Sequence, residues 1–444
     1  MKTVHWLTTL ALFTASCDVI LVLNFGGTIR FAQLMMLGVI VCALIHIVQT
    51  GKILWPRGGY ALAAWCLLQG LLISQSSAIG VSIQLYLLLL FIIAGVYATL
   101  QLYGRSTLVE PLMKVYLLSF VFVAIFGLIQ FVSPALHLGR PLVAQWIVHG
   151  LIPRINGFSY EPSYFATYLI LGWIMLIDLR VTRAQITQSR RWFYLLLLVS
   201  LALFLSTSKT AWILMLAEGG SRLWPAVVRP LRLQIGRLRA GRLILPFPRF
   251  KVVFWTATAL IAFSGFLLAV NRVVDLNQLL AGTGINGTAA HSVNDRNDRF
   301  LDTLHVIVQH PFIGRSLGGV AGNIAASYGH TVTNATELRT YWGFPAPLDI
   351  LAASGLWAFL PFLWFFFAIT RGERSLIRAR WADERSKWLH ALIRALIFEW
   401  LALLADQNLL RLYFWFHVTM IVVVGYNLRY SPAETPSAES LVPA

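Results

Sequence analysis

Six cationic side chains occupy positions where they could hold an anion. They lie near the ends of long apolar runs or in the long polar segment before residue 346, and they are Arg154, Lys209, Arg296, Arg299, Arg339 and Arg411. A guanidinium group is planar and donates two parallel hydrogen bonds, a geometry that suits phosphate. Each cation could instead cap a helix or pair with an acid, because Asp295 and Asp298 alternate with Arg296 and Arg299. As a group, the six cations favour an anion site.

Side chains that could exchange a proton or contact a sugar accompany these cations. Glu161 directly precedes Pro162 at the start of an apolar run, where a carboxylate is also favourable at a helix N-terminus. His291 and His330 lie in the longest polar segment, and either could act as a proton acceptor or simply be solvated. Tyr160 could stack on a sugar ring or anchor the chain at a membrane interface. Glu161, His291 and His330 are therefore the candidate catalytic residues.

Several common catalytic motifs are absent from the sequence. It has no Asp-x-Asp pair, no phosphate-binding Gly-rich loop, no dinucleotide-binding fingerprint and no H-E-x-x-H metal motif. We therefore predict neither a metal site nor a cofactor, and we expect chemistry that relies on the cationic side chains.

The composition indicates that these residues are positioned by membrane helices. The 444 residues are 58% hydrophobic and 12% charged, with a mean hydropathy of +0.72, whereas soluble chains carry about 25% charged residues. This excludes a disordered protein, a disulfide scaffold and an ordinary soluble enzyme. A membrane-spanning helix needs roughly 20 apolar residues, which predicts a single all-α transmembrane domain over 1–444 with about 12 spans. The predicted spans are 6–23, 32–50, 60–77, 81–103, 112–133, 163–180, 192–206, 210–224, 252–270, 346–370, 389–405 and 408–428.

The distribution of Lys and Arg predicts the orientation of these spans. The formal net charge is +17, and most of the 35 Lys and Arg residues fall on the cytoplasmic side if both termini are cytoplasmic. The segment 222–251 then becomes a basic cytoplasmic loop, for which contact with anionic lipid is favoured over nucleic acid. The segments 134–162 and 271–345 become periplasmic loops, the second containing short helices, and 430–444 becomes a disordered cytoplasmic tail.

Polar residues near the spans add to this picture. Asp18 and Glu399 fall inside predicted spans, where a carboxylate is a functional hypothesis by default. Asp406, Gln407 and Asn408 lie at the last outer turn. These positions are therefore further candidates for a site on the predicted periplasmic side.

Four short motifs resemble segments of one protein family. The run from Arg154 to Ala166 (RINGFSYEPSYFA) resembles the R-x-x-G-x-x-x-E-P-S segment of bacterial Wzy-type polysaccharide polymerases, members of the O-antigen ligase/polymerase superfamily. Ser206 to Lys209 is similar to that superfamily's Ser-x-Ser-Arg segment, with Lys in place of Arg. Arg299 followed by His310-Pro311-Phe312-Ile313-Gly314 is similar to an R…hP-x-x-G stretch, and Asn408 to Trp415 is similar to the entry to the final span.

The resemblance implies a GT-C-like fold and an enzyme in the bacterial inner membrane. Such an enzyme polymerises undecaprenyl-diphosphate-linked oligosaccharides, which serve as both donor and acceptor, into O-antigen or exopolysaccharide at the periplasmic face. On this basis Arg154, Lys209, Arg299 and then Arg411 would stabilise the diphosphate leaving group, and Glu161 or a loop histidine would accept a proton. The implied partners are the lipid-linked glycans, membrane lipid and a chain-length regulator protein.

Two other functions fit the same features. An O-antigen ligase would transfer finished glycan to lipid A core or to protein, but the ligase branch carries a His-Asn pair before the span that follows the large loop. Phe344 to Asp349 contains no His, which favours a polymerase. A transporter or flippase of lipid-linked sugars also fits about 12 spans, although the two matching halves typical of such carriers are not evident.

Overall fold

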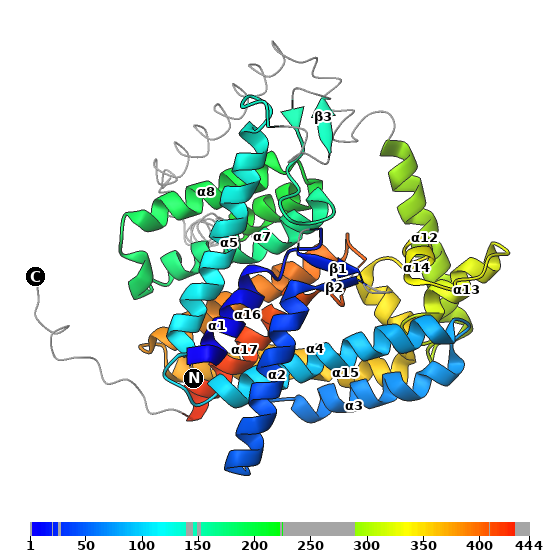
Figure 1. Cartoon of the computed structure of the whole chain (residues 1–444), viewed down its shortest axis with the longest axis horizontal. Helices are drawn as coiled ribbons and strands as arrows, with labels where there is room; N and C mark the ends of the chain where they lie inside the picture. Colours follow the sequence, from blue (N-terminus) through cyan, green and yellow to red (C-terminus); the bar gives the residue numbers. More distant parts are fainter. Residues whose placement is uncertain are drawn as a thin grey trace, which may run out of the picture.

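A computed structural model describes residues 2–19, 21–24, 28–138, 145–148, 152–222, 224, 289–407 and 409–430. Helices make up most of these residues, and two short antiparallel hairpins supply the strands (Figure 1). The N-terminal half contains α1 (Lys2–Phe13), β1 (Val22–Asn24), β2 (Thr28–Arg30), α2 (Phe31–Thr50), α3 (Gly59–Leu71), η1 (Leu72–Gln75), α4 (Ile79–Tyr103) and α5 (Val109–Val132).

The rest of the described chain continues in the same style. It contains β3 (Trp146–Val148), β4 (Ile152–Pro153), α7 (Pro162–Val181), η2 (Gln185–Thr187), α8 (Arg191–Leu205), a helical stretch over 209–222, α12 (Ala289–Gln309), α13 (Gly319–Ser327), α14 (Ala335–Thr340), α15 (Ala346–Ala379), α16 (Glu384–Leu403) and α17 (Leu412–Tyr430). Local sequence explains several boundaries. Pro162 starts α7 because its fixed φ suits the first helical position, and Gly51 ends α2 with a left-handed φ of 63°.

Five of the described helices are long and apolar enough to cross a membrane: α2, α4, α5, α7 and α15. Two shorter apolar segments, Gly59–Gln75 and Arg191–Leu205, add to them. The expectation of a helical protein with several membrane-compatible helices is therefore met. The predicted span 252–270 lies outside the described residues.

The first predicted span, 6–23, is wrong as a continuous helix. Helix α1 ends at Phe13, and Val22–Asn24 instead pairs with Thr28–Arg30 in the first hairpin. The physical reason is Asp18, whose carboxylate forms ion pairs with two arginines from other segments. An apolar run that contains such a carboxylate turns back at the end of the helical bundle.

Helix α17 forms the centre of the helical bundle. Its residues from Leu412 to Leu428 are all buried, and it packs against α4 and α16. Figure 1 shows α17 surrounded by other helices. Its apolar residues therefore serve packing within the protein.

Turns that alternate along the chain gather at two opposite ends of the helical bundle. Segments 14–30, 152–161 and 404–411 contact one another around Asp18, and we call this the Asp18 end. The other end contains the segments 51–58, 182–190 and 371–387. Arg57 donates to the Gly372 carbonyl (2.8 Å), and the Gln185 backbone N–H donates to the Glu384 carboxylate (2.9 Å). We call this the basic end because of its many Lys and Arg residues.

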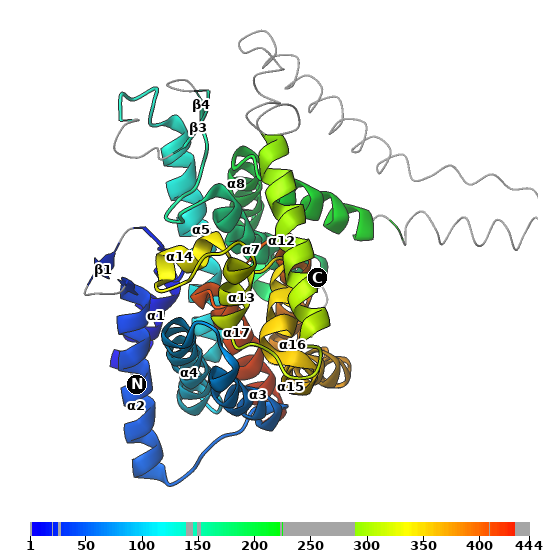
Figure 2. The same ribbon diagram turned by 90° about the vertical axis from the view of Figure 1, so that its right-hand side faces the viewer.

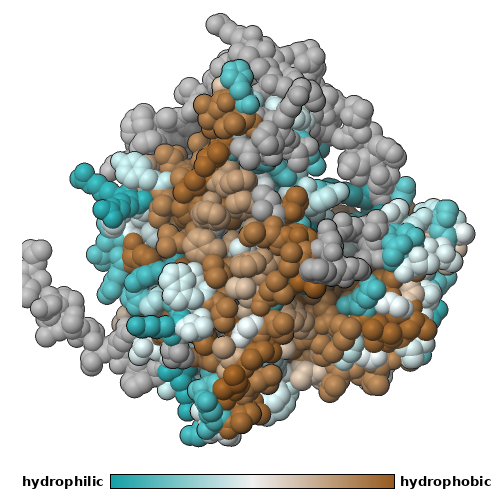
Figure 3. All heavy atoms as spheres, in the orientation of Figure 1, coloured by the Kyte–Doolittle hydropathy of each residue, from teal (hydrophilic) through white to brown (hydrophobic). Residues whose placement is uncertain are grey.

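The outer face of the helical bundle carries apolar stripes. Leu118, Phe122, Ile125 and Ile129 are exposed at helical spacing on α5, and exposed leucines and valines follow α2. Figure 3 shows hydrophobic residues over much of this face. A surface of this kind fits contact with lipid.

The long loops of the prediction contain regular structure where they are described. β3 and β4 lie within the predicted loop 134–162, and α12, α13 and α14 lie within the predicted loop 271–345. Figure 2 shows the three helices on one side of the bundle. Apart from residues 222 and 224, the predicted basic loop 222–251 lies outside the described residues, as does the tail 430–444 beyond Tyr430.

Candidate functional site

Asp18 joins several segments of the chain at the Asp18 end. Its carboxylate oxygens lie 2.6 Å from Nη1 of Arg411 and 3.0 Å from Nε of Arg30, and its backbone N–H donates to the Phe158 carbonyl (3.0 Å). The side chains of Asp18 and Arg411 are only 11% and 8% exposed. Loss of either partner would leave a buried charge, so this ion pair fixes the turn after α1 against the turn before α17.

Arg411 is held on a second side by an aromatic ring and lies near another carboxylate. Its guanidinium carbon lies 3.2 Å from the centroid of the Tyr164 ring, a cation–π contact. Asp406 accepts hydrogen bonds from the Gln407 backbone N–H (2.8 Å) and the Thr167 hydroxyl (3.4 Å). Burial raises the pKa of Asp406 above its ordinary value, and the charge of Arg411 opposes this shift. These contacts favour a positioning role for Arg411.

Arg154 and Glu161 lie at the Asp18 end, and Arg154 contacts the turn before Lys209. Arg154 is half-buried, and its Nε donates to the Thr207 hydroxyl (3.3 Å), two residues before the exposed Lys209. Burial lowers the pKa of Arg154, and the negative charge of Glu161 opposes this shift. Glu161 also accepts a hydrogen bond from the Ser163 hydroxyl (3.1 Å). The structure thus joins Arg154 to the turn that precedes Lys209, and Glu161 lies close enough to Arg154 to affect its pKa.

The segment from Arg154 to Pro162 forms a tightly held turn. The Gln130 side-chain oxygen accepts from the backbone N–H groups of Asn156 (3.0 Å) and Gly157 (2.9 Å). Gly157 has a φ of +56°, and a Cβ there would overlap the Phe165 ring. The Gly and Pro of this motif therefore have a structural explanation: Gly157 shapes the backbone between Arg154 and Glu161, and Pro162 starts α7.

A second group of predicted residues gathers around the start of α15. The guanidinium of Arg299 lies 5.3 Å from the Tyr341 ring centroid, and that of Arg296 lies 6.0 Å from the Phe344 ring centroid. The backbone N–H of Phe344 donates to the Thr303 hydroxyl (2.9 Å). Among the described residues, Nη1 of Arg299 is buried without a hydrogen-bond partner.

The two groups are linked through the chain that leads into α15. The backbone N–H of Ala346 donates to the Asp406 carbonyl (2.9 Å), so the segment after Phe344 runs to the turn that contains Arg411. One backbone hydrogen bond therefore connects the chain that follows the Arg299 group to the turn that contains Asp406 and Arg411.

The remaining predicted site residues have fewer contacts with these two groups. His330 is exposed, with its ring centroid 5.9 Å from that of Tyr341, and Tyr160 is largely exposed. His291 and Arg339 lie on α12 and α14, but their side chains are outside the described part of the structure. His330 is thus the predicted histidine that the structure brings beside the Arg299 group.

Sequence reasoning missed Arg30, and it left Asp18 and Asp406 without a role at the site. Arg30 directly precedes an apolar helix, and its backbone N–H donates to the Gln33 side chain (2.7 Å). A cation at the outer end of a predicted span was the available signal. Its partner Asp18 lies at the other end of a hairpin, which the apolar pattern did not reveal.

A buried ionic network at the basic end was also not predicted. Asp178 on α7 lies 2.8 Å from Arg222 and 2.6 Å from His390, and Glu218 lies 2.6 Å from Arg394. These contacts tie α7, the helical stretch over 209–222 and α16 together. Every one of these five side chains has an oppositely charged or hydrogen-bonding partner, which favours a structural role.

Comparisons with known proteins leave the family open. A scan against protein-family models and a search of curated proteins both returned no match. Within the described residues, no group of three His, Cys, Asp or Glu side chains could share a metal ion. The site is therefore interpreted from its own geometry.

Proposed function

We propose that the protein is a glycosyltransferase of the bacterial inner membrane that polymerises undecaprenyl-diphosphate-linked oligosaccharide repeat units. In this proposal the Asp18 end faces the periplasm and both termini are cytoplasmic. The GT-C-like arrangement and a total of about 12 spans belong to the same proposal. The apolar outer helices support insertion into a membrane, and the many cations of the basic end support its cytoplasmic orientation.

The observation that carries the proposal is the placement of Arg299. Its Nη1 is buried without a hydrogen-bond partner among the described residues, and its guanidinium lies over Tyr341. A buried guanidinium N–H without an acceptor is costly, and an anionic oxygen would satisfy it. An aromatic ring beside an anion-binding arginine also suits a sugar diphosphate.

The proposed reaction is a displacement at the anomeric carbon of the donor. The bond between this carbon and the diphosphate oxygen breaks, and an acceptor hydroxyl oxygen forms the new glycosidic bond. The hydroxyl proton passes to Glu161 or a loop histidine, while Arg154, Lys209 and Arg299 stabilise the departing undecaprenyl diphosphate. The positive charges of these side chains thus stabilise the negative charge of the leaving group.

Arg411 has a different role in this proposal. Its Nη1 is committed to Asp18 and its guanidinium to the Tyr164 ring, so it positions the outer turns. Arg411 adds positive potential near Asp406 at the site. We therefore assign direct contact with the diphosphate first to Arg154, Lys209 and Arg299.

Substitution of the proposed diphosphate ligands tests the function. We expect Arg154→Ala and Arg299→Ala, expressed at the wild-type level in cells that lack the native protein, to lose polymer while lipid-linked single repeat units accumulate. Arg374→Ala removes an exposed cation at the basic end and is the matched control. Full-length polymer from both site variants would contradict the assignment.

Substitution of Lys209 tests whether its positive charge or the exact shape of its side chain is required for polymer formation. We expect Lys209→Arg to retain polymer, because it keeps the positive charge, and Lys209→Ala to lose most of it. Activity of Lys209→Ala equal to that of the wild type would remove Lys209 from the proposed site.

A further inference from the structure

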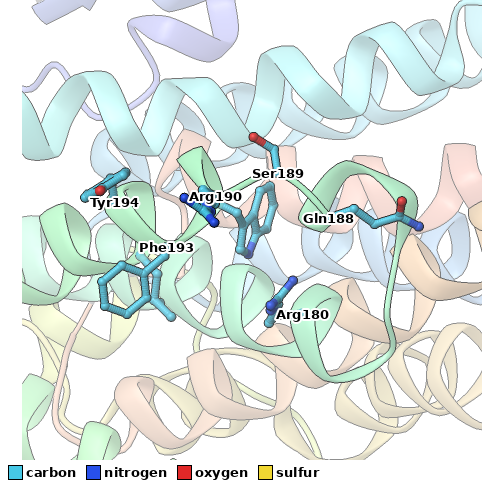
Figure 4. A pocket seen from close by; sticks show the side chains of 8 residues that line it. Arg180, Gln188, Ser189, Arg190, Phe193 and Tyr194 are labelled. Atoms are coloured by element: carbon cyan, nitrogen blue, oxygen red, sulfur yellow. The ribbon is translucent and has the colours of Figure 1, made fainter.

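A cavity lies at the basic end of the helical bundle, away from the Asp18 end. It has a volume of about 290 Å³ and lies between the end of α7 and the start of α8. Figure 4 shows Arg180, from the last turn of α7, and Arg190, from the segment before α8, among the side chains that line it. The other lining residues are Gln188, Ser189, Trp192, Phe193, Tyr194 and Leu196.

Within the described part of the chain, no carboxylate pairs with either arginine of this cavity. Arg180 donates from Nη1 to the Thr187 carbonyl (2.6 Å), which leaves its charge uncompensated. Among the described residues, neither Arg180 nor Arg190 forms an ion pair. The nearby acids are engaged elsewhere, since Asp178 pairs with Arg222 and Glu384 pairs with Lys387. The cavity therefore combines two guanidinium groups in a setting that suits an anion.

An apolar track leads away from the arginines along α8. Phe193 and Tyr194 are 64% and 66% exposed, and Leu197 and Leu201 continue the exposed stripe one and two turns further on. In the proposed orientation this track runs from the cytoplasmic surface toward the middle of the membrane. In this orientation Tyr194, in the first turn of α8, would lie near the membrane surface, where aromatic residues are enriched.

We propose that this cavity binds an anionic phospholipid, with its phosphate on Arg180 and Arg190 and an acyl chain along Phe193, Leu197 and Leu201. Charge complementarity selects the phosphate, and the adjoining apolar track selects a lipid over a free anion. Gln188 and Ser189 supply polar groups at the rim for the rest of the headgroup. The inference rests on the membrane orientation and is independent of polymerase activity.

The test uses the purified full-length protein in detergent and three probes: phosphatidylglycerol, phosphatidylcholine and inorganic phosphate. We expect phosphatidylglycerol to raise the melting temperature at concentrations where the other two have no effect. Arg190→Gln should weaken this response about fivefold, as for one cation at a membrane surface. Arg191→Gln, whose side chain does not line the cavity, is the matched control and should respond like the wild type.

Three outcomes would overturn the proposal. An equal response to phosphatidylcholine would show that lipid charge is not recognised, a response to inorganic phosphate alone would identify a free-anion site, and an unchanged response of Arg190→Gln would exclude this cavity. A second measurement does not depend on the stability of a variant. In the unmodified protein, a photoactivatable phosphatidylglycerol should cross-link within 188–201, and cross-links found only elsewhere would contradict the site.

Discussion

Asp18 is the residue on which the geometry of the Asp18 end depends most. Its carboxylate bridges Arg30 and Arg411, whose segments are far apart in the sequence. Asp18 and Arg411 are largely removed from water. Removing one partner would therefore leave the other as an unpaired buried charge and lower the stability of the fold. The proposed diphosphate ligand Arg154 is attached to the same set of turns, so its position depends on this contact.

We expect Asp18→Asn to destabilise the protein by about 3 kcal/mol, because Arg411 would keep a buried charge without its carboxylate. Thermal unfolding in detergent should show a lower melting temperature, and polymer formation should fall with it. Glu110→Gln is the control, since it breaks an exposed pair with Lys114 and should change stability little. Equal melting temperatures for Asp18→Asn and wild type would show that the ion pair does not hold the turns.

Asp406, unlike Asp18, should favour the folded protein when its carboxyl is neutral. Burial raises the pKa of its carboxyl, so the unfolded chain releases this proton at lower pH than the folded protein does. The stabilisation is therefore present at low pH and is lost as the pH rises from about 4 through the raised pKa. Asp406→Asn should remove this loss, and the stability difference between variant and wild type should shift in favour of the variant as the pH rises. A difference that is constant across this range would contradict the raised pKa.

At the scale of elements, the kink in α15 fixes the cap formed by α12 and α13. Gly355 interrupts the helix with φ 60° and ψ 172°, a conformation that is essentially restricted to glycine. Backbone groups at this interruption form hydrogen bonds with the segment after α12. The backbone N–H of Leu356 donates to the Pro311 carbonyl (2.9 Å), and the backbone N–H of Arg315 donates to the Ala352 carbonyl (3.1 Å). A Cβ on Gly314 would overlap the Ala353 backbone. The Pro and Gly of the His310 to Gly314 motif thus have a packing role.

Gly355→Ala should loosen this cap. The new Cβ would overlap the backbone of Phe312 and Gly314, and the strained conformation itself costs about 1–3 kcal/mol. We expect faster proteolysis within 310–318 and loss of polymer, because Arg299 is on α12. Gly80→Ala, at an open position without a positive φ, is the control and should behave like the wild type. Equal cleavage rates for the two variants would contradict the anchoring role.

Apolar periodicity predicted the helices much better than it predicted the turns between them. The expected spans 32–50 and 81–103 correspond closely to α2 and α4, because long uninterrupted apolar runs have few alternative structures. The span 6–23 was wrong because Asp18 finds its partners far along the chain. For the same reason, the sequence predicted Arg154 and Arg299 as candidates but could not predict that the Asp406 carbonyl accepts from Ala346 at the start of α15. Contacts between distant turns leave no local pattern.

At the scale of the whole molecule, the two ends of the helical bundle differ in how their charges are used. At the Asp18 end, a few cations surround carboxylates and aromatic rings, whereas the basic end carries many exposed Lys and Arg residues. A membrane would separate these two ends. We therefore expect residues at the Asp18 end to be accessible from the periplasm alone.

Cysteine labelling tests this orientation. In a chain whose three native cysteines are replaced, Tyr160→Cys should react with a membrane-impermeant maleimide added to the periplasmic side. Arg374→Cys should react only after the membrane is permeabilised, and it serves as the matched control because both positions are exposed. Labelling of both positions from the same side would contradict the proposed topology.

Elongation of lipid-linked glycans by the purified protein tests the proposed polymerase activity directly. The full-length chain in detergent or proteoliposomes would receive undecaprenyl-diphosphate-linked repeat units as its sole substrate, with Arg299→Ala as the matched inactive control. We expect a ladder of longer lipid-linked glycans and one released undecaprenyl diphosphate for each bond formed. Movement of the lipid-linked sugar across the membrane without any longer glycan would contradict this activity and identify a carrier instead.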